Sequence, residues 1–114
     1  IGGGPASLTV ARDLVMMGYQ CTLFERDPQA GGLMRTNIPS FRLPEEVLNE
    51  EVDQVLNLGI KTEFNSEIKS MKDFLEKDFD AVFVGTGAPK GRDINIEGRE
   101  DAHKNIHIGL LKRL

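Results

Sequence analysis

The chain begins Ile1-Gly2-Gly3-Gly4-Pro5-Ala6-Ser7, a glycine-rich turn that leads into a stretch with helical spacing. In the pattern G-x-G-x-x-G/A, the first glycine makes a tight turn and the second lets a diphosphate approach the backbone. The small third residue lets the following helix pack closely. Gly2, Gly4 and Ser7 occupy these three positions, and Pro5 suits the first helical turn. The turn therefore predicts a phosphate-binding helix N-terminus.

The residues after the turn have the pattern of an amphipathic helix followed by a short strand. Apolar side chains recur on one helical face, at Leu8, Ala11, Leu14 and Val15. Gly18 can end the helix, and Cys21–Phe24 is typical of a short buried strand. Glu25 follows, 23 residues after Gly2, close to the spacing of about 20 for an acid that binds ribose hydroxyls. A carboxylate there disfavours a 2′-phosphate, although the neighbouring Arg26 reduces that preference.

A glycine-rich turn also occurs in proteins that bind no nucleotide, so the alternative is an ordinary β–α turn with an exposed glutamate. The order of turn, helix, strand and acid favours a ligand site over that alternative.

A long connection, Asp27–Pro44 (DPQAGGLMRTNIPSFRLP), follows the acid. It contains the pair Gly31-Gly32 and two arginines, Arg35 and Arg42. A connection of this length without a helix of its own is uncommon and usually functional, and a simple NAD domain has no evident use for it. Either arginine suits a phosphate, and either could equally be a solvated loop charge.

At this point the chain resembles the flavin domain of the glutamate synthase small subunit and of dihydropyrimidine dehydrogenase. These are flavoproteins of the pyridine nucleotide–disulfide oxidoreductase type. The matching stretches are GGGPAS, LFERDPQAGGLMR, IPSFRLP, LGIKTE and DAVFVGTGAP, and the resemblance as a whole covers the chain from Ile1 to about Ile108. The resemblance implies an α/β fold: a partial Rossmann-like, doubly wound, three-layer FAD-binding domain with a parallel sheet. Residues 1–114 would form one such domain, with its first strand truncated to Ile1.

The resemblance also implies which residues surround FAD. The diphosphate would lie against the glycine turn, the adenosine ribose against the acid, and the flavin near the second glycine pair. Arginine 42 matches the residue of the family that reaches the cofactor, and the main chain of residue 68 faces adenine. The implied residues are Gly2, Gly3, Gly4, Pro5, Ala6, Glu25, Arg26, Gly32, Leu33, Arg42, Ile68, Thr86 and Gly87, with Gly31 beside them. Gly3 and Gly85 stand where alanine is common, and no residue is singled out as catalytic.

The remaining segments are predicted to be scaffold. A helix should run from Pro44 to about Gly59, and a half-buried strand should cover Ile60–Phe64. Ser70 is an N-cap candidate for a short helix. The apolar run Ala81–Val84 predicts a buried parallel strand that breaks at the next glycine, and the end from Asn105 to Leu114 is expected to be a docking strand or helix.

Composition narrows the possible partners. The net charge of −4 provides no electrostatic footprint for nucleic acid, and no apolar run is long enough for a membrane helix.

Cysteine and histidine give no sign of redox or metal chemistry. The single cysteine, Cys21, is expected to be buried and inert, and a single cysteine favours a cytoplasmic location. The chain has no C-x-x-C pair. His103 and His107 stand four apart but lack partners for a metal site, so no metal is expected.

The sequence therefore predicts the FAD-binding part of a flavin-dependent NAD(P)H oxidoreductase, a fragment that would be inactive alone. The resemblance implies an NAD(P)H-binding unit beyond Leu114, an iron–sulfur domain before Ile1 and possible association with a larger catalytic subunit. Two alternatives stay open: an NAD-binding dehydrogenase domain, and a non-catalytic Rossmann-like remnant that acts as an interaction module.

Overall fold

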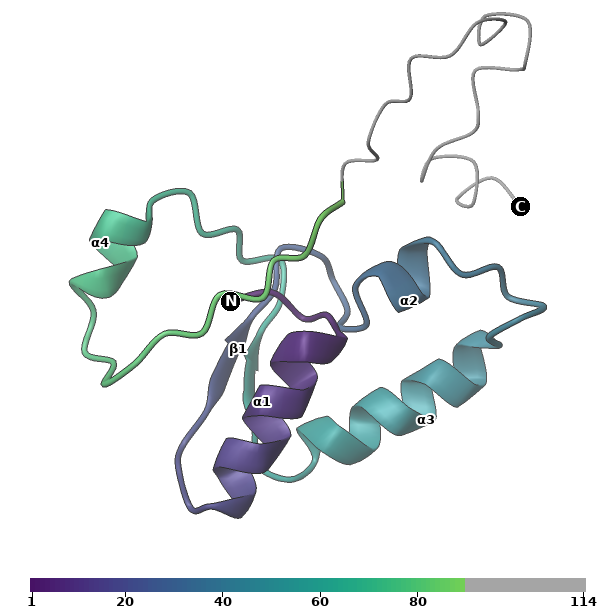
Figure 1. Ribbon diagram of the computed structural model, residues 1–114, viewed down its shortest axis with the longest axis horizontal. Coiled ribbons are helices and arrows are strands. Elements are labelled where there is room, and N and C mark those ends of the chain that lie inside the picture. The colour runs from purple at the N-terminus through teal and green to yellow at the C-terminus, as the bar shows by residue number, and fades with distance from the viewer. Residues whose placement is uncertain (90–114) are drawn as a thin grey trace, which may run out of the picture.

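The computed structural model describes residues 1–89, which form helices and two short strands in an alternating order (Figure 1). The elements are α1 (Pro5–Met16), β1 (Thr22–Phe24), α2 (Leu33–Thr36), α3 (Glu45–Leu56), β2 (Lys61–Glu63) and α4 (Met71–Leu75). None of these helices has the length and apolar character that crossing a membrane requires.

The strands β1 and β2 are parallel neighbours. Thr22 lies opposite Lys61, and Phe24 lies opposite Glu63. The chain between them contains α2 and α3, as a crossover between parallel strands requires. The three residues of β2 are exposed. The residues on either side of them are not: Ile60 is buried and Phe64 is partly buried. The prediction of a half-buried strand at 60–64 is therefore confirmed only at the two end residues.

Two further segments continue the hydrogen bonding beyond β1. The Gly2 N–H donates to the Phe24 carbonyl at 2.8 Å. On its other side, the Ile1 amino group donates to the Phe83 carbonyl at 2.6 Å, and the Gly85 N–H donates to the Ile1 carbonyl at 2.8 Å. The spatial order is thus β2, β1, Ile1 and the 83–85 run, which corresponds to the order 3-2-1-4 of doubly wound folds.

Helices lie on both faces of this arrangement. Leu23 faces a core that is shared with α1 and α3, formed by Leu8, Ala11, Leu23, Ala30, Leu48, Val52 and Ile60. The neighbouring Phe24 points to the opposite face, because successive side chains of a strand alternate. There its ring meets Phe74 of α4 and Phe79, with ring centres 5.0 and 5.9 Å away. The prediction of a layered α/β, Rossmann-like fold is confirmed.

The first helix ends as predicted, although its apolar face is less buried than expected. Gly18 has φ +93°, and its N–H donates to the Val15 carbonyl, which closes the C-terminus of α1. Leu8 and Ala11 are buried, whereas Leu14 is 37% exposed. The core therefore covers the first two turns of α1 and leaves its end open.

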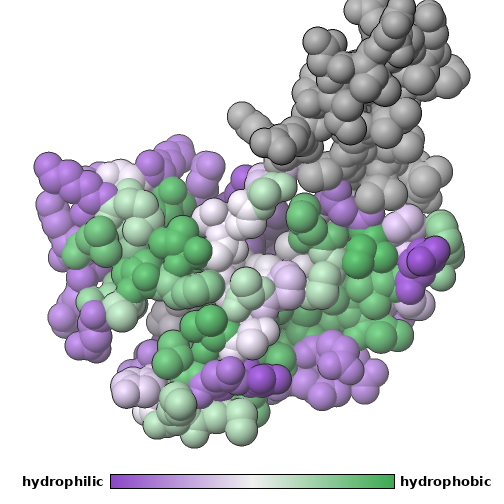
Figure 2. Space-filling model, viewed as in Figure 1, coloured by the Kyte–Doolittle hydropathy of each residue, from purple (hydrophilic) through white to green (hydrophobic). Residues whose placement is uncertain are grey.

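The run Ala81–Val84 is not the buried strand that its composition predicts. Phe83 is 45% exposed and Val84 is 53% exposed. Among the described residues the run bonds only to Ile1, which is too short to support a ladder. Figure 2 shows hydrophobic residues gathered at the surface near α4, where the exposed Leu75, Phe79 and Phe83 occur.

Two further predictions concern the connection 27–44 and the end of the chain. The connection 27–44 does contain a helix of its own, α2, so the expectation of a helix-free connection was wrong. Its four residues are too few for a periodic apolar pattern to develop. The histidines His103 and His107, for which no metal site is expected, and the element expected at Asn105–Leu114 lie outside the described residues.

Candidate dinucleotide site

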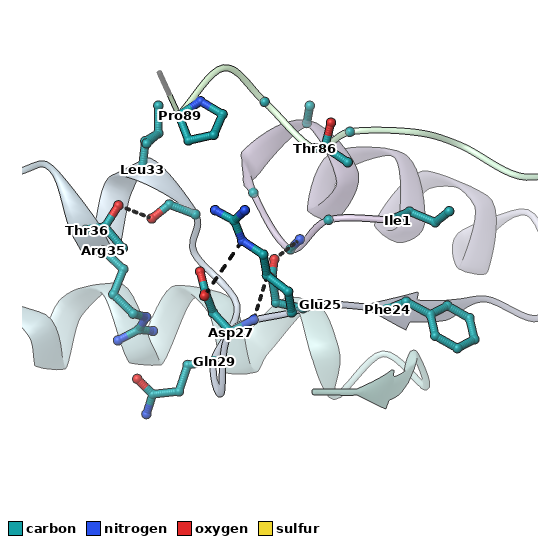
Figure 3. Close-up of a pocket in the computed structure, with 18 of the residues that line it drawn as sticks. Ile1, Phe24, Glu25, Asp27, Gln29, Leu33, Arg35, Thr36, Thr86 and Pro89 are labelled. Atoms are coloured by element: carbon teal, nitrogen blue, oxygen red, sulfur yellow. Dashed lines mark hydrogen bonds and ion pairs between the residues drawn. The ribbon is translucent and has the colours of Figure 1, made fainter. Parts of the chain in front are cut away.

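A cavity of about 700 Å³ lies where the carboxyl end of β1 meets the glycine turn and the start of α1 (Figure 3). Ligands of open α/β sheets bind at this end of the strands. Of the residues that the resemblance places around FAD, Arg42 and Gly31 do not line the cavity. Those that line it are Gly2, Gly3, Gly4, Pro5, Ala6, Glu25, Arg26, Gly32, Leu33, Ile68, Thr86 and Gly87. The sequence-distant segments expected to share one site therefore do meet.

The glycine turn approaches the opposite wall of the cavity closely. Gly2 has φ +93°, and a Cβ on it would stand 2.9 Å from the carbonyl carbon of Gly85 and 3.1 Å from Cα of Thr86. Both the conformation and the contact require glycine here. The backbone of the turn consequently lies directly against the backbone of the wall at Gly85 and Thr86.

Gly4 is different, because it faces open space. Its backbone is extended (φ −77°, ψ 176°), so other residues could adopt the conformation, and an added Cβ would meet nothing within 4 Å. Gly4 is the N-cap of α1, no side chain caps the helix, and the first turn has no acidic residue. The backbone N–H groups of the first turn of α1 therefore border the cavity without a capping side chain, which suits a diphosphate.

Glu25 is buried at the end of β1, with 6% of its surface exposed, and still lines the cavity. One carboxylate oxygen accepts a short hydrogen bond from the Gly3 N–H, and the other accepts from the Asp27 N–H at 2.9 Å (Figure 3). Each oxygen keeps a further lone-pair site. The carboxylate is thus fixed in place and can still accept hydrogen bonds from a ribose.

Arg26 lies at the exposed edge of the cavity. Its Nε is 3.8 Å from a carboxylate oxygen of Asp27, which also lines the cavity. The adjacent carboxylate partly neutralises this guanidinium, so Arg26 offers a 2′-phosphate less attraction than an unpaired arginine would.

The second glycine pair packs directly on the first turn. The Gly31 N–H donates to the Gly3 carbonyl at 2.7 Å. Gly32 has φ +54°, and a Cβ on it would stand 2.8 Å from Cα of Gly4. The resemblance implies that this pair lies near the flavin; in the structure it packs against the glycine turn.

Of the two arginines in the connection 27–44, Arg35 lines the cavity and Arg42 does not. Arg35 belongs to α2, and its side chain is only 17% exposed. Its Nε donates to the Ala30 carbonyl at 2.9 Å, and its Nη1 is 3.3 Å from Glu45 Oε1. Arg42 is exposed and does not line the cavity. The helical turn of α2 explains the difference, because it directs residue 35 back towards the loop before it.

The sequence analysis missed several polar residues of the wall. Thr36, the last residue of α2, and the buried Asn37 that follows it line the cavity, and the Thr36 hydroxyl lies 2.7 Å from the Asn37 side-chain oxygen. Ser66 and Glu67 line it from the connection after β2, where the Ser66 N–H donates to the Glu25 carbonyl at 2.8 Å. Their position directly after a strand was the available signal, since such residues gather at the ligand-binding edge.

The cavity has the chemistry of a binding site. In residues 1–89 no group of His, Cys, Asp and Glu side chains is placed to hold a metal ion. The walls combine an uncapped helix N-terminus, a fixed carboxylate and backbone polar groups, and glycines form the parts of the wall at the turn, at Gly32 and at Gly85 and Gly87. Such a frame can hold and orient a dinucleotide.

Comparison with known proteins agrees with this geometry. The chain is 36% identical over 112 residues to an NADP(+)-dependent formate dehydrogenase subunit beta of Moorella thermoacetica, covering 96% of this chain and 16% of that protein. It is 38% identical over 112 residues to a glutamate synthase [NADPH] small chain of Bacillus subtilis, covering 96% and 22%. It is 32% identical over 115 residues to a Salmonella typhi homologue of the NAD-dependent dihydropyrimidine dehydrogenase subunit PreT, covering 99% and 28%.

The chain thus spans less than a third of the length of these relatives. The resemblance to glutamate synthase small subunits and dihydropyrimidine dehydrogenases is confirmed by the relatives themselves. Residues 1–77 match the family described as NAD(P)-binding Rossmann-like domain, and that stretch contains the glycine turn, Glu25 and the wall at Ile68. The chain belongs to the NAD(P)-binding Rossmann-like domain family.

Proposed function

We propose that the cavity binds FAD and that the chain is the FAD-binding part of a flavin-dependent NAD(P)H oxidoreductase. The observation that carries the proposal is the joint position of Gly4 and Glu25. An uncapped helix N-terminus and a fixed, buried carboxylate border one cavity, as the two ends of an ADP group require. The names of the relatives, all of them oxidoreductase subunits, support the reaction class.

In this proposal each wall has a defined task. The first turn of α1 holds the diphosphate with backbone N–H groups, and Glu25 accepts hydrogen bonds from the adenosine ribose. The main chain at Ile68 lies against adenine, and Gly32 with Leu33 directs the rest of the molecule towards the flavin end. A bound flavin supplies the hydride chemistry, while the chain holds and orients it.

The preference for FAD over NAD depends on the connection 27–44. In the structure this segment contributes Asp27, Gln29, Gly32, Leu33 and Arg35 to the wall. An ordinary NAD-binding unit needs only the turn, α1, β1 and the acid. The additional wall favours FAD, whose riboflavin half is larger than the nicotinamide riboside of NAD and would extend along the connection. The NAD alternative is supported by the description of the matching family and is therefore tested in parallel.

The proposal also covers the rest of the protein. We infer that electrons come from NAD(P)H bound by another unit, and that an iron–sulfur domain or a larger catalytic subunit accepts them. The names of the relatives as subunits or chains support such an assembly.

Purification of the intact protein tests the proposal directly. We expect a yellow protein whose flavin is released on denaturation and identified as FAD by chromatography. The protein stripped of flavin should bind added FAD more tightly than NADH in a fluorescence titration. A colourless protein that binds NADH and ignores FAD would establish the dehydrogenase alternative, and binding of neither would favour the remnant.

A further inference from the structure

Ser7 is an exception among the buried polar groups. It is 3% exposed, and its hydroxyl oxygen is the buried side-chain oxygen that lacks a hydrogen-bond partner within residues 1–89. The third position of the glycine pattern takes Gly or Ala, so the serine hydroxyl is additional volume at a crowded place. Ser7 does not line the cavity. The hydroxyl therefore serves neither a protein hydrogen bond nor direct contact with a ligand there.

The Ser7 hydroxyl faces Gly85, a residue without a side chain, on the neighbouring segment. A Cβ on Gly85 would overlap the Ser7 Oγ and would stand 2.9 Å from Cε1 of Phe83. Gly85 has no positive φ, so its backbone conformation does not require glycine. The contact with Ser7 is thus the main reason that this position excludes alanine.

Gly85 connects this contact to the cavity. Its N–H donates to the Ile1 carbonyl at 2.8 Å, and its backbone lies against Gly2 of the phosphate turn. Directly after it, Thr86 and Gly87 form the wall opposite that turn (Figure 3). Any displacement of Gly85 from α1 would consequently move this wall relative to the helix N-terminus.

We propose that Ser7 and Gly85 are a matched positioning pair. The hydroxyl of Ser7 fills the space that the methyl group of an alanine at position 85 would need. The contact between Ser7 and Gly85 sets the separation between the Thr86–Gly87 wall and the phosphate turn. Gly85 can then be changed to alanine only together with a change of Ser7 to alanine. The pair acts on the cofactor through the wall, and this part rests on the proposed function.

A double-mutant cycle in the intact protein tests the pair. It compares the original protein with Gly85→Ala, with Ser7→Ala and with the double variant, by FAD affinity and by urea unfolding without cofactor. Gly85→Ala should weaken FAD binding about tenfold and lower the urea midpoint, because the new methyl group pushes the wall from α1. Ser7→Ala should match the original protein or unfold at slightly higher urea, because it removes an unpaired buried hydroxyl.

The double variant should restore both measurements, with FAD affinity within about threefold of the original, because contacting residues couple. Ser40→Ala combined with Gly85→Ala is the matched control: Ser40 is exposed in the connection before α3, so no rescue should occur.

Additive effects in both measurements would overturn the pair, and so would a harmless Gly85→Ala. Coupling in urea midpoints with equal FAD affinity in all variants would reduce the pair to a packing contact and overturn the positioning role. If the original protein binds no FAD, the proposed function fails separately. The pair is then judged by urea midpoints alone, where additivity refutes it.

Discussion

Replacement of Glu25 by glutamine is the most informative perturbation of the site. The carboxylate accepts from two backbone N–H groups, those of Gly3 and Asp27, one at each oxygen. A glutamine keeps one acceptor oxygen but turns an NH2 donor towards the second N–H. One of the two bonds is therefore lost, and a buried donor is left facing another donor.

The magnitude follows from these two bonds. A hydrogen bond to a charged group contributes about 1.5–3 kcal/mol, and a buried N–H without an acceptor costs about 1–3 kcal/mol. The neutral amide is easier to bury than the carboxylate, which offsets part of the loss. We expect Glu25→Gln to reduce the free energy of unfolding by about 2 kcal/mol and Glu25→Ala by about 3 kcal/mol. FAD binding should weaken by about tenfold or more, because the ribose loses a charged acceptor.

Urea unfolding followed by circular dichroism measures the first effect, and flavin fluorescence titration of the stripped protein measures the second. Glu67→Gln is the matched control: Glu67 lines the same cavity but is exposed, so neither quantity should change. If Glu25→Gln retains the original stability and FAD affinity, the carboxylate supports neither the turn nor the ribose, and the reasoning about the site is refuted.

Three further predictions separate binding from stability. Gly4→Ala should leave the urea midpoint unchanged but weaken FAD binding about tenfold or more, since its methyl group enters open space beside the diphosphate; equal affinity would show that the ligand does not approach there. Arg35→Lys should cost about 1 kcal/mol of unfolding free energy and lower FAD affinity, because the Nε bond to the Ala30 carbonyl is lost, whereas Arg42→Lys should change neither in the same assays. Phe74→Ala should lower the unfolding free energy by about 3–5 kcal/mol, because it removes the ring that packs on the far face of β1, and a loss below about 1 kcal/mol in urea unfolding would contradict the described layer.

The sequence was sufficient where the backbone chemistry of single residues decides the structure. The spacing from Gly2 to Glu25 predicted the turn, the helix and the acid, and the structure brings them to one cavity because parallel strands end at a common edge. The position of Ile68 at the same cavity came from the family resemblance. Thr86 also had a local signal, because it lies in the glycine break at the carboxyl end of the run 81–84, where open α/β sheets bind ligands.

Other features could not be predicted because they depend on tertiary neighbours. The apolar composition of Ala81–Val84 is the same whether its faces are covered or open, and only the structure shows its exposure. The choice between Arg35 and Arg42 depends on α2, a single helical turn without a sequence period. A Cβ on Gly4 would enter empty space, whereas a Cβ on Gly85 would overlap Ser7. This difference depends on packing, so the sequence, which has glycine at both positions, does not reveal it.

The peptide groups on either side of Gly3 are engaged on both sides, by Glu25 through the N–H and by Gly31 through the carbonyl. A loop immobilised in this way loses little conformational entropy when a ligand binds, so ordering of the protein subtracts little from the binding free energy. Association should then follow a single fast phase whose rate rises linearly with ligand concentration, without the plateau that a slow rearrangement of the turn would impose.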